Sequence, residues 1–253
     1  MDENPMKKLL LLAIIATLGS GCATTTIKSE AFGKKTRYAV VSIVGATDIT
    51  DVDGDKRSSS LVGMISAVAS SDINFSEDSG KMFNDTRKII DEEFKKAKSF
   101  KYVNSKALLK SRAYKNAKGE EPKVAIFKIG LAPGYKYFNT DNMNEIKKII
   151  KGNKLDGAII INASYNYGTG GVNVGGLVSV GKTRGYTTLQ ISAIDKDLKT
   201  VWSQSIRKES AEGIGNFGGA PSFKKLYPLL KESTRSAVKE AVTTLDSTVY
   251  AKK

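Results

Sequence analysis

The chain has 253 residues, a single cysteine, no histidine and a formal net charge of +14. Without histidine, Ser-His-Asp catalysis, Cys-His catalysis and histidine zinc sites are excluded, and one cysteine cannot form a disulfide within the chain. Carboxylate pairs, Ser-Lys dyads and a carboxylate metal site remain open to an enzyme such as an envelope hydrolase, but none has a recognisable spacing here. We expect a protein that is not an enzyme and that has no catalytic residue, metal site or cofactor. The basic surplus suits contact with something anionic, such as lipid headgroups, acidic glycans or an acidic protein face. The lysines are spread along the whole chain without a dense run, however, so we interpret the surplus as a solvated basic surface.

The first segment has the order of a secretory signal. Met6, Lys7 and Lys8 are followed by an apolar run over residues 9–18 and then by small residues that lead to Cys22. An apolar core of about 7–15 residues is typical of a signal peptide, whereas a membrane span needs about 20 residues. The acidic residues before Met6 do not suit a basic signal region, so we expect translation to start at Met6.

Cys22 follows Gly19-Ser20-Gly21 directly, and this box resembles the signal of bacterial lipoproteins, although Gly19 stands where leucine is usual. The resemblance implies that residues 1–21 are removed and that Cys22 is lipidated as the first mature residue. Ala23 follows the cysteine in place of aspartate, which the resemblance implies sends the protein to the outer membrane. We expect the domain to face the periplasm, and exposure at the cell surface is the alternative. An ordinary signal peptide with an incidental cysteine is the alternative. Nucleic acid and nucleotide are poor partners for an exported chain.

A tether is expected over residues 22–36, which are rich in Thr, Lys and Ser, and a single α/β domain over residues 37–250. Hydrophobic periodicity and turn residues define the elements of this domain. In chain order we expect a strand at 38–44, a polar stretch at 45–77 around the apolar piece 61–68, helices at 85–98 and 106–114, a strand at 123–128, a helix at 142–152, a strand at 157–165, a hairpin of strands 186–194 and 199–206, and a helix from 222 or 228 to 245.

The alternation of strands and helices, followed by an antiparallel hairpin, predicts an α/β (α+β-like) fold. It would have a mixed β-sheet with a C-terminal antiparallel hairpin and helices packed against it. Between the predicted strands, residues 165–187 contain many glycines, and glycine weakens strands. We therefore expect a long glycine-rich loop at 165–187 and a second one at 213–219.

Three short motifs imitate ligand sites. Residues 176–183 read GLVSVGKT, the spacing of a phosphate-binding P-loop, but a β pattern and no helix follows them. Residues 213–218 match a dinucleotide fingerprint, yet no second parallel strand follows, and residues 51–55 resemble a calcium loop without its last carboxylate. We interpret the first two as coincidences and the third as an acidic turn, with adventitious calcium binding left open.

The pieces that carry a wider resemblance are Cys22, the first strand, the unit over 146–161, the hairpin over 188–203 with Asp195 and Trp202, and the closing helix. Together they resemble the exported α/β lipoproteins that include the curli-secretion channel CsgG, the amino-terminal domain of TolB and the penicillin-binding-protein activator LpoB. The resemblance lies in the pattern and covers most of the mature chain.

This resemblance implies a lipid-tethered protein that acts without catalysis, through protein contacts, in envelope assembly, secretion or regulation. The alternative is an oligomeric outer-membrane secretion pore of the curli-channel type, in which residues 165–188 would form membrane-spanning hairpins. Apart from the membrane, the expected partner is an envelope protein, and a homo-oligomer is possible. Because binding residues concentrate on loops, the candidate contact residues are Tyr165, Tyr167, Val174, Leu177, Lys182, Arg184 and Phe217.

Overall fold

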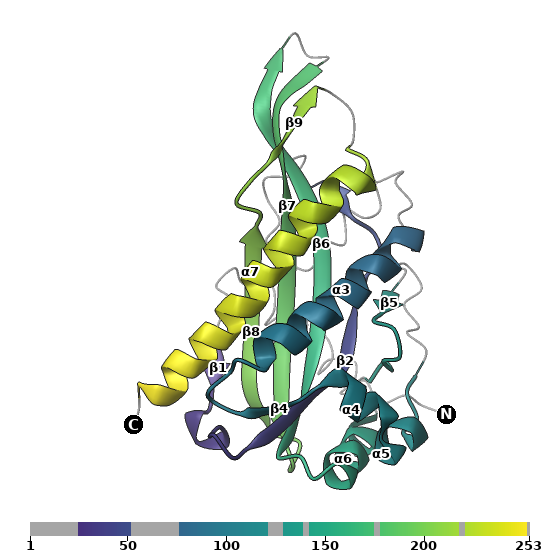
Figure 1. Ribbon diagram of the computed structural model, residues 1–253, viewed down its shortest axis with the longest axis vertical. Helices are drawn as coiled ribbons and strands as arrows, with labels where there is room; N and C mark the ends of the chain where they lie inside the picture. The colour runs from purple at the N-terminus through teal and green to yellow at the C-terminus, as the bar shows by residue number, and fades with distance from the viewer. Residues whose placement is uncertain are drawn as a thin grey trace, which may run out of the picture.

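The computed structural model describes residues 25–51, 76–120, 129–138, 142–174, 178–217 and 221–251 (Figure 1). The predicted signal peptide, Cys22, the apolar piece 61–68 and the strand at 123–128 lie outside these ranges. The elements are β1 (Thr26–Ile27), η1 (Ser29–Ala31), β2 (Arg37–Ala46), β3 (Thr50–Asp51), α3 (Ser76–Phe94), β4 (Lys101–Val103), α4 (Ser105–Lys110), α5 (Arg112–Asn116), β5 (Ile129–Leu131), α6 (Met143–Gly152), β6 (Gly157–Val174), β7 (Val178–Asp195), β8 (Thr200–Glu209), β9 (Ile214–Phe217) and α7 (Phe223–Tyr250).

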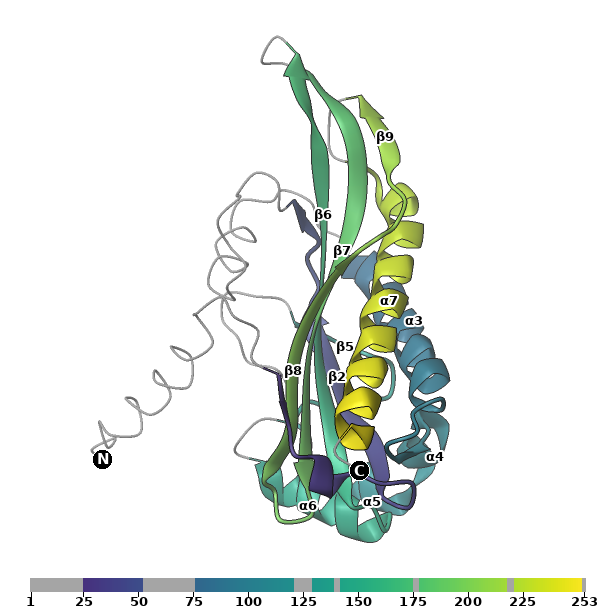
Figure 2. The same cartoon turned by 90° about the vertical axis from the view of Figure 1, so that its left-hand side faces the viewer.

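The strands form one mixed nine-stranded sheet in the order β1-β8-β7-β6-β2-β4, with β3 added to β6, β5 to β2 and β9 to β7. β2 and β6 run parallel, whereas β6, β7 and β8 are antiparallel neighbours. Helices α3 and α7 lie side by side on one face of this sheet, and α4, α5 and α6 gather at one end (Figures 1 and 2). The predicted fold class is confirmed.

Alternation along the central strands explains which face is buried. Ile159, Ile161 and Ala163 are fully buried on β6, whereas Asn162 between them is exposed. On β7, buried Leu189 and Ile191 alternate with partly exposed neighbours in the same way. Since successive side chains of a strand point to opposite faces, these residues form one apolar surface, which α7 covers.

The predicted hairpin between β7 and β8 is also confirmed. The Asp195 carboxylate accepts hydrogen bonds from the backbone N–H of Asp197 at 2.8 Å and of Lys199 at 2.9 Å. Leu198 has a positive φ of 65°, which completes the tight reversal. These contacts fix the register that places Trp202 opposite Ala193, where its side chain is fully buried.

The predicted glycine-rich loop at 165–187 is wrong. β6 and β7 are each 18 residues long, and their antiparallel pairing continues without a break to Val174 opposite Val178. The continuous ladder satisfies the backbone hydrogen bonds, and this outweighs the low strand propensity of glycine. The second predicted loop, at 213–219, is wrong for residues 214–217, which form β9 against β7.

Gly185 shows why glycine is needed within this long strand. A Cβ atom on Gly185 would lie 2.9 Å from the backbone and side chain of Leu229 and from the backbone of Leu230. The glycine therefore allows α7 to approach β7 more closely than any side chain would permit.

The predicted tether is wrong for residues 26–36. Thr26 and Ile27 pair with Ser203 and Trp202 of β8, and the backbone N–H of Lys28 donates to the Val201 carbonyl at 2.8 Å. Further along, the segment packs into the core, because only 4 % of Phe32 is exposed. The chain is thus attached to the sheet from Thr26 onward.

The predicted helices are present with shifted ends. α3 begins well before the expected residue 85, and the segment 106–114 is divided into α4 and α5 at Ser111, whose side chain caps α5. α6 matches its predicted range closely. α7 begins after Ser222, one of the two expected starts, and runs beyond the expected end to Tyr250.

Polar contacts fix α3 against α7. Arg235 of α7 forms salt bridges of 2.8 Å with both Glu92 and Glu93 of α3, and Asp85 of α3 accepts a short hydrogen bond from the Tyr227 hydroxyl. Burial raises the pKa of Asp85, but hydrogen bonds from Tyr227 and neighbouring lysines lower it by more than burial raises it. The pKa of Asp85 therefore lies below its ordinary value. The carboxylate therefore stays ionised and holds the two helices together.

Candidate functional site

The most prominent feature of the fold is the projecting end of the long hairpin, which we call the ribbon tip. It comprises residues 168–174 of β6, 178–184 of β7 and 214–217 of β9. The pairing of β3 with β6 ends at Tyr167, and that of β8 with β7 ends at Tyr186. Beyond these residues, β9 is the only further strand in the described part of the chain. Figures 1 and 2 show the ribbon tip extending past the helices and the rest of the sheet.

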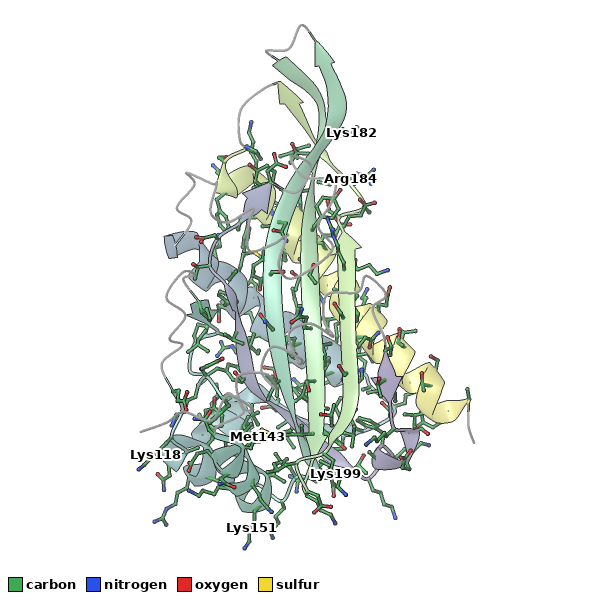
Figure 3. The ribbon with its side chains drawn as sticks, turned by 180° about the vertical axis from the view of Figure 1, so that it is seen from behind. Lys118, Met143, Lys151, Lys182, Arg184 and Lys199 are labelled. Carbon is green, nitrogen blue, oxygen red and sulfur yellow. The ribbon has the colours of Figure 1, made fainter. Side chains whose placement is uncertain are left out.

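Two of the predicted contact residues lie on the ribbon tip with described side chains. Lys182 is exposed, and Arg184 forms a salt bridge of 2.8 Å with Glu209 of β8. Figure 3 shows both residues near this end of the molecule, whereas Lys118, Lys151 and Lys199 lie at the opposite end. The backbones of Val174 and Phe217 also belong to the ribbon tip, where they pair with Val178 and Val180, and Leu177 lies outside the described residues.

Tyr165 and Tyr167 are wrong as contact residues, because both are buried under the helices. Only 1 % of Tyr165 and 5 % of Tyr167 is exposed. The Tyr165 hydroxyl forms a 2.7 Å hydrogen bond with Thr86 of α3, and burial raises its pKa. These side chains therefore serve the core below the ribbon tip and cannot reach a partner.

The residues of the apparent P-loop lie in a strand. Gly181, Lys182 and Thr183 belong to β7, and each is paired on one side with β6 and on the other with β9. Such an extended backbone directs its N–H groups to neighbouring strands, not to a phosphate group. The residues of the apparent dinucleotide fingerprint that are described lie in or next to β9, and of the apparent calcium loop only Asp51 is described.

Within the described ranges, no helix is long and apolar enough to cross a membrane. The same ranges contain no group of three or more acidic, histidine or cysteine side chains that could hold a metal ion.

No protein-family model matches the chain, and no curated protein matches it. Among solved structures, the chain is similar to the hypothetical protein CT253 from Chlamydia trachomatis, with 7 % identity and a TM-score of 0.38 over 86 % of this chain and 99 % of that one. It is also similar to the lipoprotein GNA1162 from Neisseria meningitidis, with 13 % identity and a TM-score of 0.32 over 86 % of this chain and 96 % of that one. Similarity at this level assigns neither a family nor a function.

Proposed function

We propose that the protein is an outer-membrane lipoprotein, anchored by lipid on Cys22 and facing the periplasm, that acts without catalysis in envelope assembly, secretion or regulation. The basic and apolar leader that ends at this single cysteine supports the anchor. The ribbon tip, which projects from a rigid sheet, supports a role in protein contacts. A partner protein would meet this end of the molecule.

The observation that carries the proposal is the short connection between Cys22 and the sheet. β1 begins at Thr26, so only residues 23–25 separate it from the lipidated residue. With about 3.8 Å between consecutive Cα atoms, Cys22 lies at most about 15 Å from Thr26. A lipid on Cys22 would therefore hold the β1 edge of the sheet close to the bilayer surface.

The same geometry separates the ribbon tip from the membrane. Thr26 lies opposite Ser203, which lies opposite Ser192 of β7. Val178 is fourteen residues further along β7, which corresponds to about 45 Å at the ordinary rise of a strand. With β1 paired, the ribbon tip is far from the anchor and is free to meet a partner in the periplasm.

The secretion pore is kept as the second candidate, because the long β6–β7 hairpin is the feature that it requires. For the ribbon tip to enter the same membrane, Cys22 would have to lie level with Arg184, where the ribbon tip begins. Arg184 is eight residues along β7 from Ser192, the residue level with the start of β1, and this distance is about 26 Å. This exceeds the reach of the residues before β1. A pore would therefore require β1 to separate from β8.

The first prediction concerns the anchor itself. We expect the full-length protein to need mild detergent for extraction and to have the light-scattering mass of a monomer or dimer, whereas the Cys22→Ala variant should need none once its leader is removed. The reason is that lipid on Cys22 is the proposed attachment to the membrane. A large uniform ring that still requires detergent after Cys22→Ala would contradict the proposal and would favour the pore.

A further inference from the structure

A basic groove lies at the end of the molecule that carries the N-terminal segment. It has a volume of about 1020 Å³ and runs between the last turns of α7, the α3–β4 loop and the turn before β2. We call it the lysine groove, and the residues that matter here are Lys34, Lys95, Lys98, Lys101, Asp246 and Tyr250. Figure 1 shows the C-terminal end of α7 beside β1 and η1, and α7 contacts η1 directly.

The charge of the lysine groove is strongly positive. Its lining contains four ammonium groups and a single carboxylate, that of Asp246. All four lysines are exposed, and in the described part of the chain none of them forms a salt bridge. Lys96, next to Lys95 in the sequence, is by contrast paired with Glu93 at 2.8 Å. The groove therefore keeps a surplus of unpaired positive charge.

The carboxylate in the lysine groove has a structural partner. Asp246 accepts hydrogen bonds from the backbone N–H of Lys98, at 3.0 and 3.1 Å, and of Ser99, at 2.8 Å. The Tyr250 hydroxyl donates to the Lys98 carbonyl at 2.6 Å. α7 thus binds both the N–H groups and a carbonyl of the α3–β4 loop, which fixes where its lysines emerge and partly satisfies the negative charge of Asp246.

The position of the lysine groove indicates its ligand. Phe32, five residues after Ile27, packs against Phe100, which lines the groove, with ring centroids 6.4 Å apart and ring planes tilted by 57°. The N-terminal segment therefore reaches the groove, which Lys34 lines. If Cys22 is anchored as proposed above, a leaflet surface lies within reach of these lysines, and two further lysines, Lys252 and Lys253, follow α7 in the sequence.

We propose that the lysine groove binds the phosphate groups of anionic phospholipid headgroups in the leaflet that holds the Cys22 lipid. This inference rests on the proposed function for the orientation of the domain. Each lysine near an anionic bilayer surface contributes a factor of roughly five in binding, and several in one groove act together. Such binding would hold the β1 edge on the membrane and keep the ribbon tip pointing away from it.

The test measures how fast individual lysines react with an acetylating reagent, read by mass spectrometry, in the lipidated protein reconstituted into vesicles. In vesicles that contain phosphatidylglycerol, we expect the four groove lysines to react roughly fivefold more slowly than in phosphatidylcholine alone, and high salt should remove the difference. Lys224, Lys225 and Lys239, which are exposed elsewhere on α7, should react equally in both.

A matched pair of variants distinguishes the groove from overall charge. The Lys34→Gln, Lys98→Gln, Lys101→Gln variant should lose the protection of its remaining groove lysine, Lys95. The control variant Lys224→Gln, Lys225→Gln, Lys239→Gln, with the same change in net charge, should keep it. All six side chains are exposed, so neither variant is expected to change stability by more than about 0.5 kcal/mol.

Three outcomes would overturn the inference: equal protection in phosphatidylcholine alone, loss of protection in both variants, or protection by soluble glycerol phosphate without vesicles, which would make the ligand a free phosphate ester. Failure of the proposed function has a separate signature, because the intact mass would then lack acyl groups on Cys22. If phosphatidylglycerol still protected the groove lysines in such a chain, the result would support phosphate binding by the lysine groove without the Cys22 lipid.

Discussion

Replacing Gly45 with alanine is expected to destabilise the protein by about 3–5 kcal/mol, at the upper end of what overpacking produces. Gly45 of β2 lies opposite Ala163 of β6, and an added Cβ would lie only 1.7 Å from the Ala163 carbonyl oxygen. Backbone cannot yield as a flexible side chain can, so the two strands would have to separate. Because β2 and β6 are central in the sheet, the loss should appear as a lower midpoint in denaturant unfolding.

Gly80 provides the matched control for this substitution. It lies in α3, is exposed, and a Cβ there would have no neighbour within 4 Å. Alanine is favoured over glycine in a helix by about 1 kcal/mol, so Gly80→Ala should leave the protein unchanged or slightly more stable. A Gly45→Ala protein as stable as the Gly80→Ala protein would show that β2 and β6 do not pair as described.

Phe32→Ala is expected to lower the free energy of unfolding by about 3–5 kcal/mol, the usual range for truncating a buried aromatic ring. Phe32 stacks on Tyr38 with ring centroids 5.0 Å apart and meets the edge of Trp202 at 6.5 Å. It is the most deeply buried side chain of the N-terminal segment, and Ile27 and Ala31 pack more loosely against the same core. Its loss should also release β1, which hydrogen exchange of the Lys28 amide, bonded to the Val201 carbonyl, would report.

Lys35 is the control for Phe32, since it lies in the same segment and its side chain is exposed. Lys35→Ala should change the stability by less than about 0.5 kcal/mol and leave the exchange of the Lys28 amide unchanged. Equal exchange in the Phe32→Ala and Lys35→Ala proteins would contradict the account, because it would mean that the aromatic contacts do not hold β1 on the sheet.

Much of the sheet could be predicted because its strands have a strong local pattern. The apolar run at the start of β6 indicates a buried central strand, and the alternation in β7 together with the turn at Asp195 indicates a hairpin. Each of these signals lies within a few consecutive residues. The mixed order of strands and helices then leaves few possible topologies.

The ribbon tip could not be predicted in this way. Gly168, Gly170 and Gly171 have low strand propensity, and the partners that stabilise them, Arg184, Lys182 and Gly181, lie on the returning strand and not among their immediate neighbours in the sequence. β1 has only two residues, too few for any periodicity, and its position depends on the burial of Phe32. Both features are fixed by tertiary pairing and not by local preference.

The burial of Tyr165 and Tyr167 could have been predicted from the sequence. The alternation that buries Ile159, Ile161 and Ala163 continues with the same period to Tyr165 and Tyr167, so both belong to the helix-covered face. The glycines that begin at Gly168 obscured this continuation. Lys182 and Arg184 could be predicted to lie at the surface, because charged side chains are uncommon in a core.

The measurement that tests the account most directly is the position of the ribbon tip relative to the bilayer. In the lipidated protein the Cys22 sulfur carries the lipid, so a cysteine introduced by Lys182→Cys is the only free thiol and can carry a single fluorophore. A second protein labelled through Lys35→Cys reports the end near the anchor. Both proteins are placed in vesicles whose lipids carry a quencher.

We expect the label at residue 35 to be quenched and the label at residue 182 to remain unquenched. The reason is that, with β1 paired, Ser192 lies level with the start of β1 and residue 182 is ten residues further along β7, or about 33 Å. Strong quenching at residue 182 would place the ribbon tip in the membrane and would contradict the proposal of a lipid-anchored protein that meets its partner in the periplasm.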